Sequence, residues 1–251
     1  MHRRFYFVLL IGLFIIFIQP NKINAEQRSN VDQKLLRDIL ITLLDPYISE
    51  GIEHYYGYRK SYSLYDAKII DLSREEESEF SFKVKIQVNT FEAAHNPPYG
   101  KETILLEVDL DQVRVIKFNH QGDEWERKIT KFYDAVLSDI QQTLHVDLTS
   151  YKKFNDKQLM FKSEKQKAFK SLANIVANII DNELTSEINP PYKNVIYPVT
   201  FVRENQGYIL FKKADGTNIL LEVSKLNDHW VVVNKKSKQG KKMKNELLWY
   251  M

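Results

Sequence analysis

The spacing of the apolar residues changes from a helical to a strand period, and it does so twice along the chain. Between residues 35 and 56 the apolar residues recur every three or four positions, which predicts a helix with one buried face. Asp32 can cap the start of this helix, and Gly57 can end it. Strict alternation follows over residues 80–88, which is typical of a strand with one buried and one wet face. Weaker strands are expected at residues 65–72, 103–110 and 112–118.

The second half of the chain repeats this order with one additional helix. Apolar stripes predict helices over residues 125–144 and 163–184, and Ser163 with Gln166 predicts a capping box at the start of the second one. A polar connection is expected between these helices, over residues 147–162. Strand-like runs then follow at residues 195–202, 208–212, 218–223 and 230–234.

These patterns predict an α+β fold of two domains, in which one or more helices pack on an antiparallel β-meander, of the cystatin-like or nuclear-transport-factor-like kind. We expect the first domain at residues 26–122 and the second at residues 123–236, followed by a lysine-rich segment over residues 237–251. Ile-Leu-Leu-Glu-Val and Asn-Pro-Pro-Tyr each occur once in either half, but with different separations. Whether the halves arose by duplication therefore stays open.

Residues 1–25 have the three parts of a secretory signal peptide. Two arginines near the start precede an unbroken apolar run from residue 5 to residue 18, and the segment ends at Ala25. The run is shorter than the roughly 20 residues of a helix that spans a bilayer. We therefore expect cleavage between Ala25 and Glu26 and an exported protein, either secreted or held at the cell envelope. The alternative is a signal that is retained as an anchor.

Cysteine content and charge narrow the setting further. The chain has no cysteine, and export without cysteine fits a Gram-positive bacterium better than a eukaryotic secretory route. The net charge of +3 comes from residues 1–25, so the charge of the exported part gives no reason to expect nucleic acid as a partner. Residues 26–124 contain 12 basic and 19 acidic side chains, and residues 125–251 contain 21 and 14. The two halves should attract one another or meet different partners.

The most unusual segment is the predicted loop at residues 91–100. Two prolines and a glycine stiffen this loop, which can therefore bind a ligand or partner at a low cost in ordering. The alternative is a connection whose prolines only set its path. The candidate binding residues are His95, Asn96, Pro97, Pro98 and Tyr99.

A second candidate surface lies at the C-terminus. Six lysines followed by Leu-Leu-Trp-Tyr-Met are suited to contact an anionic surface. The alternative is a solvated basic turn whose apolar end tucks against the domain. The candidate residues are Lys235, Lys236, Lys238, Lys241, Lys242 and Lys244.

The motifs of known catalytic chemistry are missing from the sequence. No two histidines have the spacing of a zinc protease, and no serine stands in a Gly-x-Ser-x-Gly elbow. The glycines are isolated and do not form a phosphate-binding loop. We therefore name no catalytic residue, no metal ligand and no cofactor.

Several short motifs in the first half resemble a known bacterial family. They are Leu-Leu-Asp-Pro-Tyr-Ile at residues 43–48, Tyr-Tyr-Gly at residues 55–57, Tyr-Asp-Ala-Lys at residues 65–68 and Ala-His-Asn-Pro-Pro-Tyr-Gly at residues 94–100. Together they are similar to the domain-of-unknown-function 3888 family, from Leu35 to about Phe118. The resemblance implies an exported protein of a spore-forming Gram-positive bacterium with an independent first domain, and it implies no activity. Residues 125–251 resemble no family in this way.

The sequence thus favours a non-catalytic binding module at the cell envelope. Its expected partner is an anionic cell-wall polymer, a membrane surface or another envelope protein. The alternative is an extracytoplasmic hydrolase with a site in the concavity of a sheet. Such a hydrolase requires polar residues that converge under a helix, for example His95 with an Asp or Glu from a neighbouring strand.

Overall fold

The computed structural model describes residues 22–251, with the exception of residues 75 and 79. The basic start and the apolar run of the predicted signal peptide lie outside these described residues. The chain divides into two compact units, residues 1–45 and residues 46–251. None of the described helices is long and apolar enough to cross a membrane. The signal peptide, its cleavage and the domain boundary near residue 122 stay predictions.

The first helix is longer than its apolar stripe indicated. Helix α2 covers Lys22–Tyr56, and Lys22 is the first described residue, so Asp32 and the predicted cleavage site at Ala25 and Glu26 lie inside the helix. Its end is where the sequence placed it. Gly57 has φ of +73°, and its N–H donates to the carbonyl oxygen of Glu53 at 2.8 Å. A left-handed residue that closes a helix in this way is favourable only for glycine and a few polar residues.

The first sheet is an antiparallel meander with one covered face. Its strands are β1 (Ser61–Tyr62), β2 (Lys68–Arg74), β3 (Phe82–Glu92), β4 (Asn96–Val108) and β5 (Val113–Gly122). Strands β3, β4 and β5 are neighbours, and both β1 and β2 pair with β3. Ile48 and Ile52 from the last turns of α2 are buried, and a Cβ at Gly51 would lie 3.3 Å from a methyl of Val115 on β5. The buried side chains of β3 are on the same face, because alternate residues of a strand share a face.

The prediction that residues 91–100 form a loop is wrong. Strand β3 continues to Glu92, the 3-10 turn η1 covers only Ala93–His95, and β4 already begins at Asn96. The two prolines are tolerated because pairing between β4 and β5 begins only at Gly100, beyond Pro98. Proline lacks the N–H that a ladder needs, so it is confined to the edges and first residues of strands.

The second sheet is also an antiparallel meander. Helix α3 (Glu124–Leu144) precedes it, and helices α4 (Asp156–Lys165) and α5 (Lys170–Ile179) are inserted after its first strand. Short turns η2 (Lys167–Phe169), η3 (Ile180–Leu184) and η4 (Thr185–Glu187) flank α5. The strands, in their order across the sheet, are β6 (Lys152–Phe154), β7 (Ile196–Arg203), β8 (Gln206–Lys212), β9 (Thr217–Leu226) and β10 (His229–Gln239).

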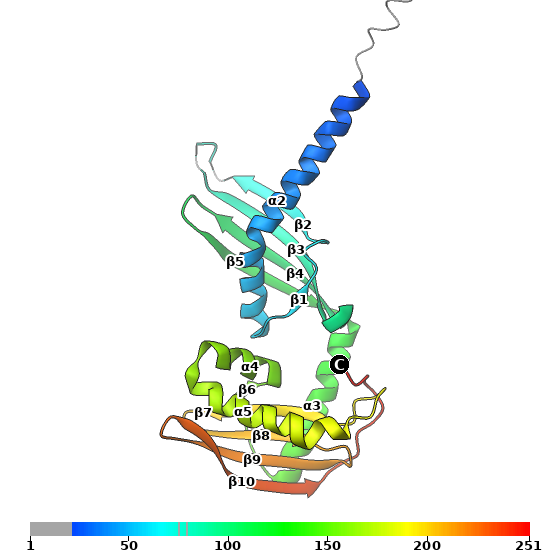
Figure 1. Ribbon diagram of the computed structural model, residues 1–251, viewed down its shortest axis with the longest axis vertical. Coiled ribbons are helices and arrows are strands. Elements are labelled where there is room, and N and C mark those ends of the chain that lie inside the picture. Colours follow the sequence, from blue (N-terminus) through cyan, green and yellow to red (C-terminus); the bar gives the residue numbers. More distant parts are fainter. Residues whose placement is uncertain (1–21, 75, 79) are drawn as a thin grey trace, which may run out of the picture. The chain divides into compact units, whose positions relative to one another are not determined.

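This second sheet is covered on both faces. Ile209 and Phe211 of β8 belong to a core with Leu159 of α4 and Val176 of α5, while Leu210 belongs to a second core with α3. Figure 1 shows α4 and α5 along one face of the five strands. Strands buried on both faces are apolar at successive positions, and residues 209–211 and 219–221 are all buried. Helices on antiparallel sheets in both halves confirm the predicted α+β class.

The observed start of α4 corrects the prediction for residues 147–166. Residues 147–162 are not a plain connection, since they contain β6 and most of α4. The capping box is formed by Asn155 and Gln158, whose side chains each accept from the other's backbone N–H. Ser163 instead lies inside α4, and Gln166 is the residue that closes it. The predicted capping box at Ser163 and Gln166 is therefore wrong, because these residues lie at the end of α4 and the observed box lies at its start.

Candidate functional site

One face of α3 is basic, and helical spacing explains why. Lys128, Lys131 and Asp139 are separated by three or four residues or their multiples, so they lie along one side of the helix. The helix is well capped, because the side chain of Asp123 accepts from the backbone N–H of Glu126 at 2.8 Å. A rigid helix thus presents two lysines one turn apart.

The C-terminal segment, residues 240–251, is held against this helix at its first end. Gly240 donates its N–H to the carbonyl oxygen of Gly216 at 3.1 Å, and Lys241 donates its N–H to Oδ2 of Asp139 at 3.4 Å. A Cβ added to Gly240 would lie 2.3 Å from Nδ2 of Asn218, so only glycine permits this close approach. The lysines that follow therefore start from a defined position beside α3.

The far end of the same segment is also held. Leu247 and Met251 are buried in a core with Phe132 of α3. Lys193 donates its backbone N–H to the carbonyl oxygen of Leu247 at 2.9 Å and its ammonium to that of Met251 at 2.7 Å. Burial lowers the pKa of Lys193 to about 8, with the charge of Asp156 acting in the opposite direction. The apolar end of the segment therefore packs against the rest of the protein. This packing was expected under the alternative in which the C-terminal segment is a solvated basic turn with a buried apolar end.

A cavity of about 580 Å³, which we call the lysine cavity, lies between α3 and the C-terminal segment. Lys128 and Lys131 come from the helix, and the C-terminal segment contributes Lys241, Lys242 and Lys244. Each of these five side chains is exposed. The volume is within the range of about 300–1,000 Å³ that is usual for ligand sites.

An ion pair between Lys212 and Asp139 lies at the base of the lysine cavity. Lys212 is almost fully buried, and its ammonium donates to Asp139 at 3.1 Å and to Asn218 at 2.7 Å. Although burial disfavours the charged form of Asp139, hydrogen bonds from Asn218 and Lys212 and the charge of Lys212 lower its pKa. Because Lys212 is neutralised in this way, the excess positive charge of the cavity comes from the five exposed lysines, of which Lys244 pairs with the lining residue Glu246 at 3.7 Å.

The structure divides the six lysines that the sequence proposed for anionic contact. Lys241, Lys242 and Lys244 line the cavity. Lys235 and Lys236 lie on β10, where they pair with Glu183 at 3.1 Å and Glu222 at 2.6 Å. Lys238 lies on the same strand and is exposed. The partners on α3, Lys128 and Lys131, were missed because nothing in the sequence places them opposite the C-terminus.

A second polar cluster lies under the end of α2. Two cross-strand rows of the first sheet form it: Thr90 pairs with Gly100 and Gly100 with Gly122, while Val88 pairs with Glu102 and Glu102 with His120. The two neighbouring glycines leave a hollow on this face. A Cβ at Gly100 would lie 2.3 Å from Oε1 of Glu102 and 2.7 Å from the hydroxyl of Tyr56.

His120 is the centre of this cluster. Its Nδ1 lies 3.0 Å from Oε2 of Glu102, and its Nε2 lies 2.8 Å from Oε2 of Glu126 on α3. Tyr56 and Thr90 donate their hydroxyls to Oε1 of the fully buried Glu102 at 2.7 and 2.8 Å. Burial disfavours the charged imidazole, but the hydrogen bonds and charges of Glu126 and Glu102 prevail and raise its pKa.

The sequence did not identify this cluster. A signal was present, because Glu102 falls at a position where the alternation of β4 demands a buried side chain, and a charge there requires a partner. Which histidine supplies the partner depends on the register between β4 and β5, and the pattern of residues does not specify that register.

The predicted binding residues around His95 lie elsewhere. His95 is exposed and stacks on Phe91, with 4.1 Å between ring centroids, and Tyr99 donates its hydroxyl to the carbonyl oxygen of His95 at 2.7 Å. Both line a cavity of about 530 Å³ with Asn89, Lys101 and Gln121. Those three residues are cross-strand neighbours, one position out of step with the Thr90 row, so they are on the opposite face of the sheet.

The polar groups of the turn at residues 93–96 find hydrogen-bond partners within the turn. Asn96 donates its side-chain amide to the carbonyl oxygen of Ala93 at 2.9 Å, and Pro97 and Pro98 are half-buried. His95 therefore does not join the polar cluster of His120. Whether these residues bind a ligand stays a prediction. Within the described part of the chain, no group of three or more His, Asp or Glu side chains is arranged to hold a metal ion.

The fold and these surfaces define an α+β protein that carries two helix-covered antiparallel meanders and a preformed basic cavity. Residues 36–121 match the family described as "Protein of unknown function (DUF3888)", which confirms the resemblance seen in the sequence. The match covers α2 from residue 36 together with the first sheet, and it does not include the lysine cavity. Comparisons with curated proteins and with solved structures find no match.

Proposed function

We propose that the protein is an exported, non-catalytic binding protein of the cell envelope, which holds a phosphate-bearing anionic polymer in the lysine cavity. The observation that carries this proposal is the convergence of Lys128 and Lys131 on α3 with Lys241, Lys242 and Lys244. The predicted signal peptide supports a location outside the cytoplasmic membrane. Because the exported part has no net charge overall, the clustering of lysines at one site is not a consequence of a generally basic surface.

The geometry favours binding for an energetic reason. Both ends of the C-terminal segment are anchored, so the backbone that carries three of the lysines is ordered before any ligand arrives. A ligand then does not have to offset the loss of backbone freedom, which otherwise costs about 1–2 kcal/mol for each residue that becomes ordered. Lysines spaced along a helix and a facing segment suit a chain of repeated negative charges better than one isolated anion.

Binding of the purified, exported protein to envelope fragments tests the proposal. Co-sedimentation should fall steeply as salt is raised, because exposed charges are screened within about 10 Å at 0.1 M ionic strength. Long-chain inorganic polyphosphate should compete, while anionic phospholipid vesicles should not. Mass spectrometry of the exported protein should find Glu26 as its first residue.

A paired substitution locates the site. Each lysine near an anionic surface contributes about 1 kcal/mol, so Lys131→Gln with Lys242→Gln should weaken polyphosphate binding by about 30-fold. Lys167→Gln with Lys170→Gln removes the same charge outside the cavity and should leave the affinity unchanged. Equal losses in both double variants, or retention that ignores salt, would refute the proposal.

The hydrolase alternative is less well supported. Polar residues do converge under α2, which that alternative required, but they are Glu102, His120 and Glu126 and do not include His95. A general base must be free to accept a proton from its substrate. Both ring nitrogens of His120 already have carboxylate partners, and Glu102 is fully buried. A hydrolytic activity of the exported protein that His120→Gln abolishes, in a variant that remains folded, would reverse this ranking.

A further inference from the structure

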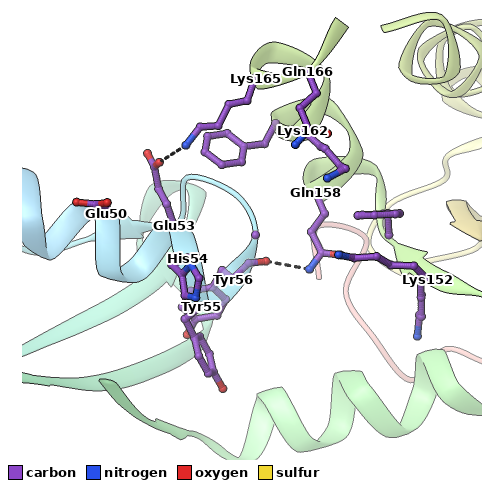
Figure 2. A pocket seen from close by; sticks show the side chains of 14 residues that line it. Glu50, Glu53, His54, Tyr55, Tyr56, Lys152, Gln158, Lys162, Lys165 and Gln166 are labelled. Carbon is purple, nitrogen blue, oxygen red and sulfur yellow. Dashed lines mark hydrogen bonds and ion pairs between the residues drawn. The ribbon is translucent and has the colours of Figure 1, made fainter. Parts of the chain in front are cut away.

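A second cavity, of about 430 Å³, lies where the last turns of α2 face β6 and α4 (Figure 2). In Figure 2, Glu50 and Glu53 project from α2, while Lys162 and Lys165 of α4 and Gln166, which follows α4, lie on the other side. Aromatic side chains form much of the remaining wall, and they are Tyr55, Tyr56, Phe154 and Phe161. We call this space the α2–α4 cavity.

Two lysines converge on one buried ring in this cavity. The ammonium of Lys152 lies 5.5 Å from the ring centroid of Phe154, and that of Lys162 lies 5.6 Å from the same centroid. Phe154 is 7% exposed and belongs to the core of the second sheet, so it cannot move aside. Within the described residues, neither lysine forms an ion pair with a carboxylate. Burial and the neighbouring charge of Lys152 lower the pKa of Lys162.

The other cations of the cavity are already matched. Lys165 pairs with Glu53 at 3.2 Å, and Glu53 also receives Arg59 at 3.4 Å. Lys153 approaches Asp134 at 4.0 Å. The amide of Gln158 donates to the carbonyl oxygen of Tyr56 at 2.8 Å, which ties α4 to the end of α2. Lys152 and Lys162 are therefore the lysines of this wall without a carboxylate partner in the described residues, and they outnumber its remaining carboxylate, Glu50.

We propose that the α2–α4 cavity binds a small organic phosphate monoester, with its phosphate between Lys152 and Lys162 and its apolar body against the aromatic wall. The number of charges on the ligand favours a phosphate group over a carboxylate. A phosphate monoester carries nearly two negative charges above its second pKa of about 6, so it neutralises both lysines, whereas a carboxylate leaves one unmatched. Lysine, a compact point charge, suits phosphate, while the planar pairing of a carboxylate favours arginine. This inference does not depend on the lysine cavity.

Calorimetric titration of the exported protein with phenyl phosphate at pH 8 and low ionic strength tests the inference. Phenyl phosphate should bind at least tenfold more tightly than benzoate, which has the same ring and a single charge. Lys152→Gln and Lys162→Gln should each weaken phenyl phosphate binding at least tenfold. The control variant Lys170→Gln, which removes an exposed lysine outside the cavity, should bind as the unsubstituted protein does.

The outcomes separate this site from the lysine cavity. The double variant Lys131→Gln with Lys242→Gln should retain phenyl phosphate binding, and its loss there would overturn the inference. Equal affinity for benzoate, or no binding at millimolar phenyl phosphate, would overturn it as well. Lys162 also contacts the ring of Phe169 at 4.7 Å, so the exposed Lys152 provides the variant least able to disturb the fold. Unchanged affinity in a folded Lys152→Gln protein refutes the assignment.

Discussion

Substitution of Gly100 by alanine tests the polar cluster of His120 with a single methyl group. The backbone of Gly100 lies within β4 and does not have a positive φ, so alanine is compatible with its conformation. The added carbon would lie 2.3 Å from Oε1 of Glu102, 2.4 Å from Oγ1 of Thr90 and 2.7 Å from the hydroxyl of Tyr56. Glu102 and Thr90 are fully buried, so neither can swing away into solvent.

The expected loss of stability has two parts. Overpacking of a buried site costs about 1–3 kcal/mol. To make room, the carboxylate of Glu102 must also give up its hydrogen bonds from Tyr56 and Thr90, and each such bond contributes about 1 kcal/mol net. We therefore expect Gly100→Ala to lower the free energy of unfolding by about 3–5 kcal/mol.

Urea denaturation followed by far-UV circular dichroism measures this change. The matched control is Gly51→Ala on α2, where the atoms nearest the added carbon are the methyls of Val115 at 3.3 and 3.7 Å and the ring of Phe118 at 3.5 Å. Alanine is the better helix former, so the control should change stability by less than about 1 kcal/mol. In a Glu102→Ala background, the cost of Gly100→Ala should shrink by more than about 1 kcal/mol. A cost below 1 kcal/mol in the original background would refute the packing argument.

Three further predictions concern other elements. The pKa of His120 is raised above its ordinary value of 6.5, so the stability that its charged ring contributes is complete below pH 6.5 and is lost as the pH rises through the raised pKa. Urea denaturation at a series of pH values between 6 and 9 should show this loss of stability. The pH dependence should be absent in His120→Gln. Asn155→Ala removes the cap of α4 and should cost about 1 kcal/mol, whereas Ser163→Ala should cost less than half of that, and equal costs would contradict the observed helix start. Leu247→Ala leaves a cavity beside Phe132 and should cost about 2–4 kcal/mol, and it should expose the C-terminal segment to limited proteolysis; an unchanged digestion pattern would show that the segment is not held there.

Local patterns were sufficient for the types and order of most elements. The two apolar periods indicated α3 and eight of the ten strands, because burial of one face is a property of each segment alone. The short strands β1 and β6 were missed, and β4 begins seven residues before its predicted start. Gly57 ended α2 as predicted, since a left-handed residue is a local requirement. The start of α4 was missed because Ser163 with Gln166 has the same capping-box spacing as Asn155 with Gln158. The bond from Gln158 to Tyr56, a contact across 102 positions, accompanies the choice of Asn155.

The candidate sites required the tertiary structure. The sequence by itself determined an α+β chain with a basic end and a family resemblance over its first half. Only the fold decided that Lys241, Lys242 and Lys244 face Lys131, or that His120 meets Glu102. The physical reason is that such encounters depend on strand register and helix docking, which are settled by the sum of many weak, distant contacts. A charge pattern shows that partners are needed, and only packing determines which partners meet.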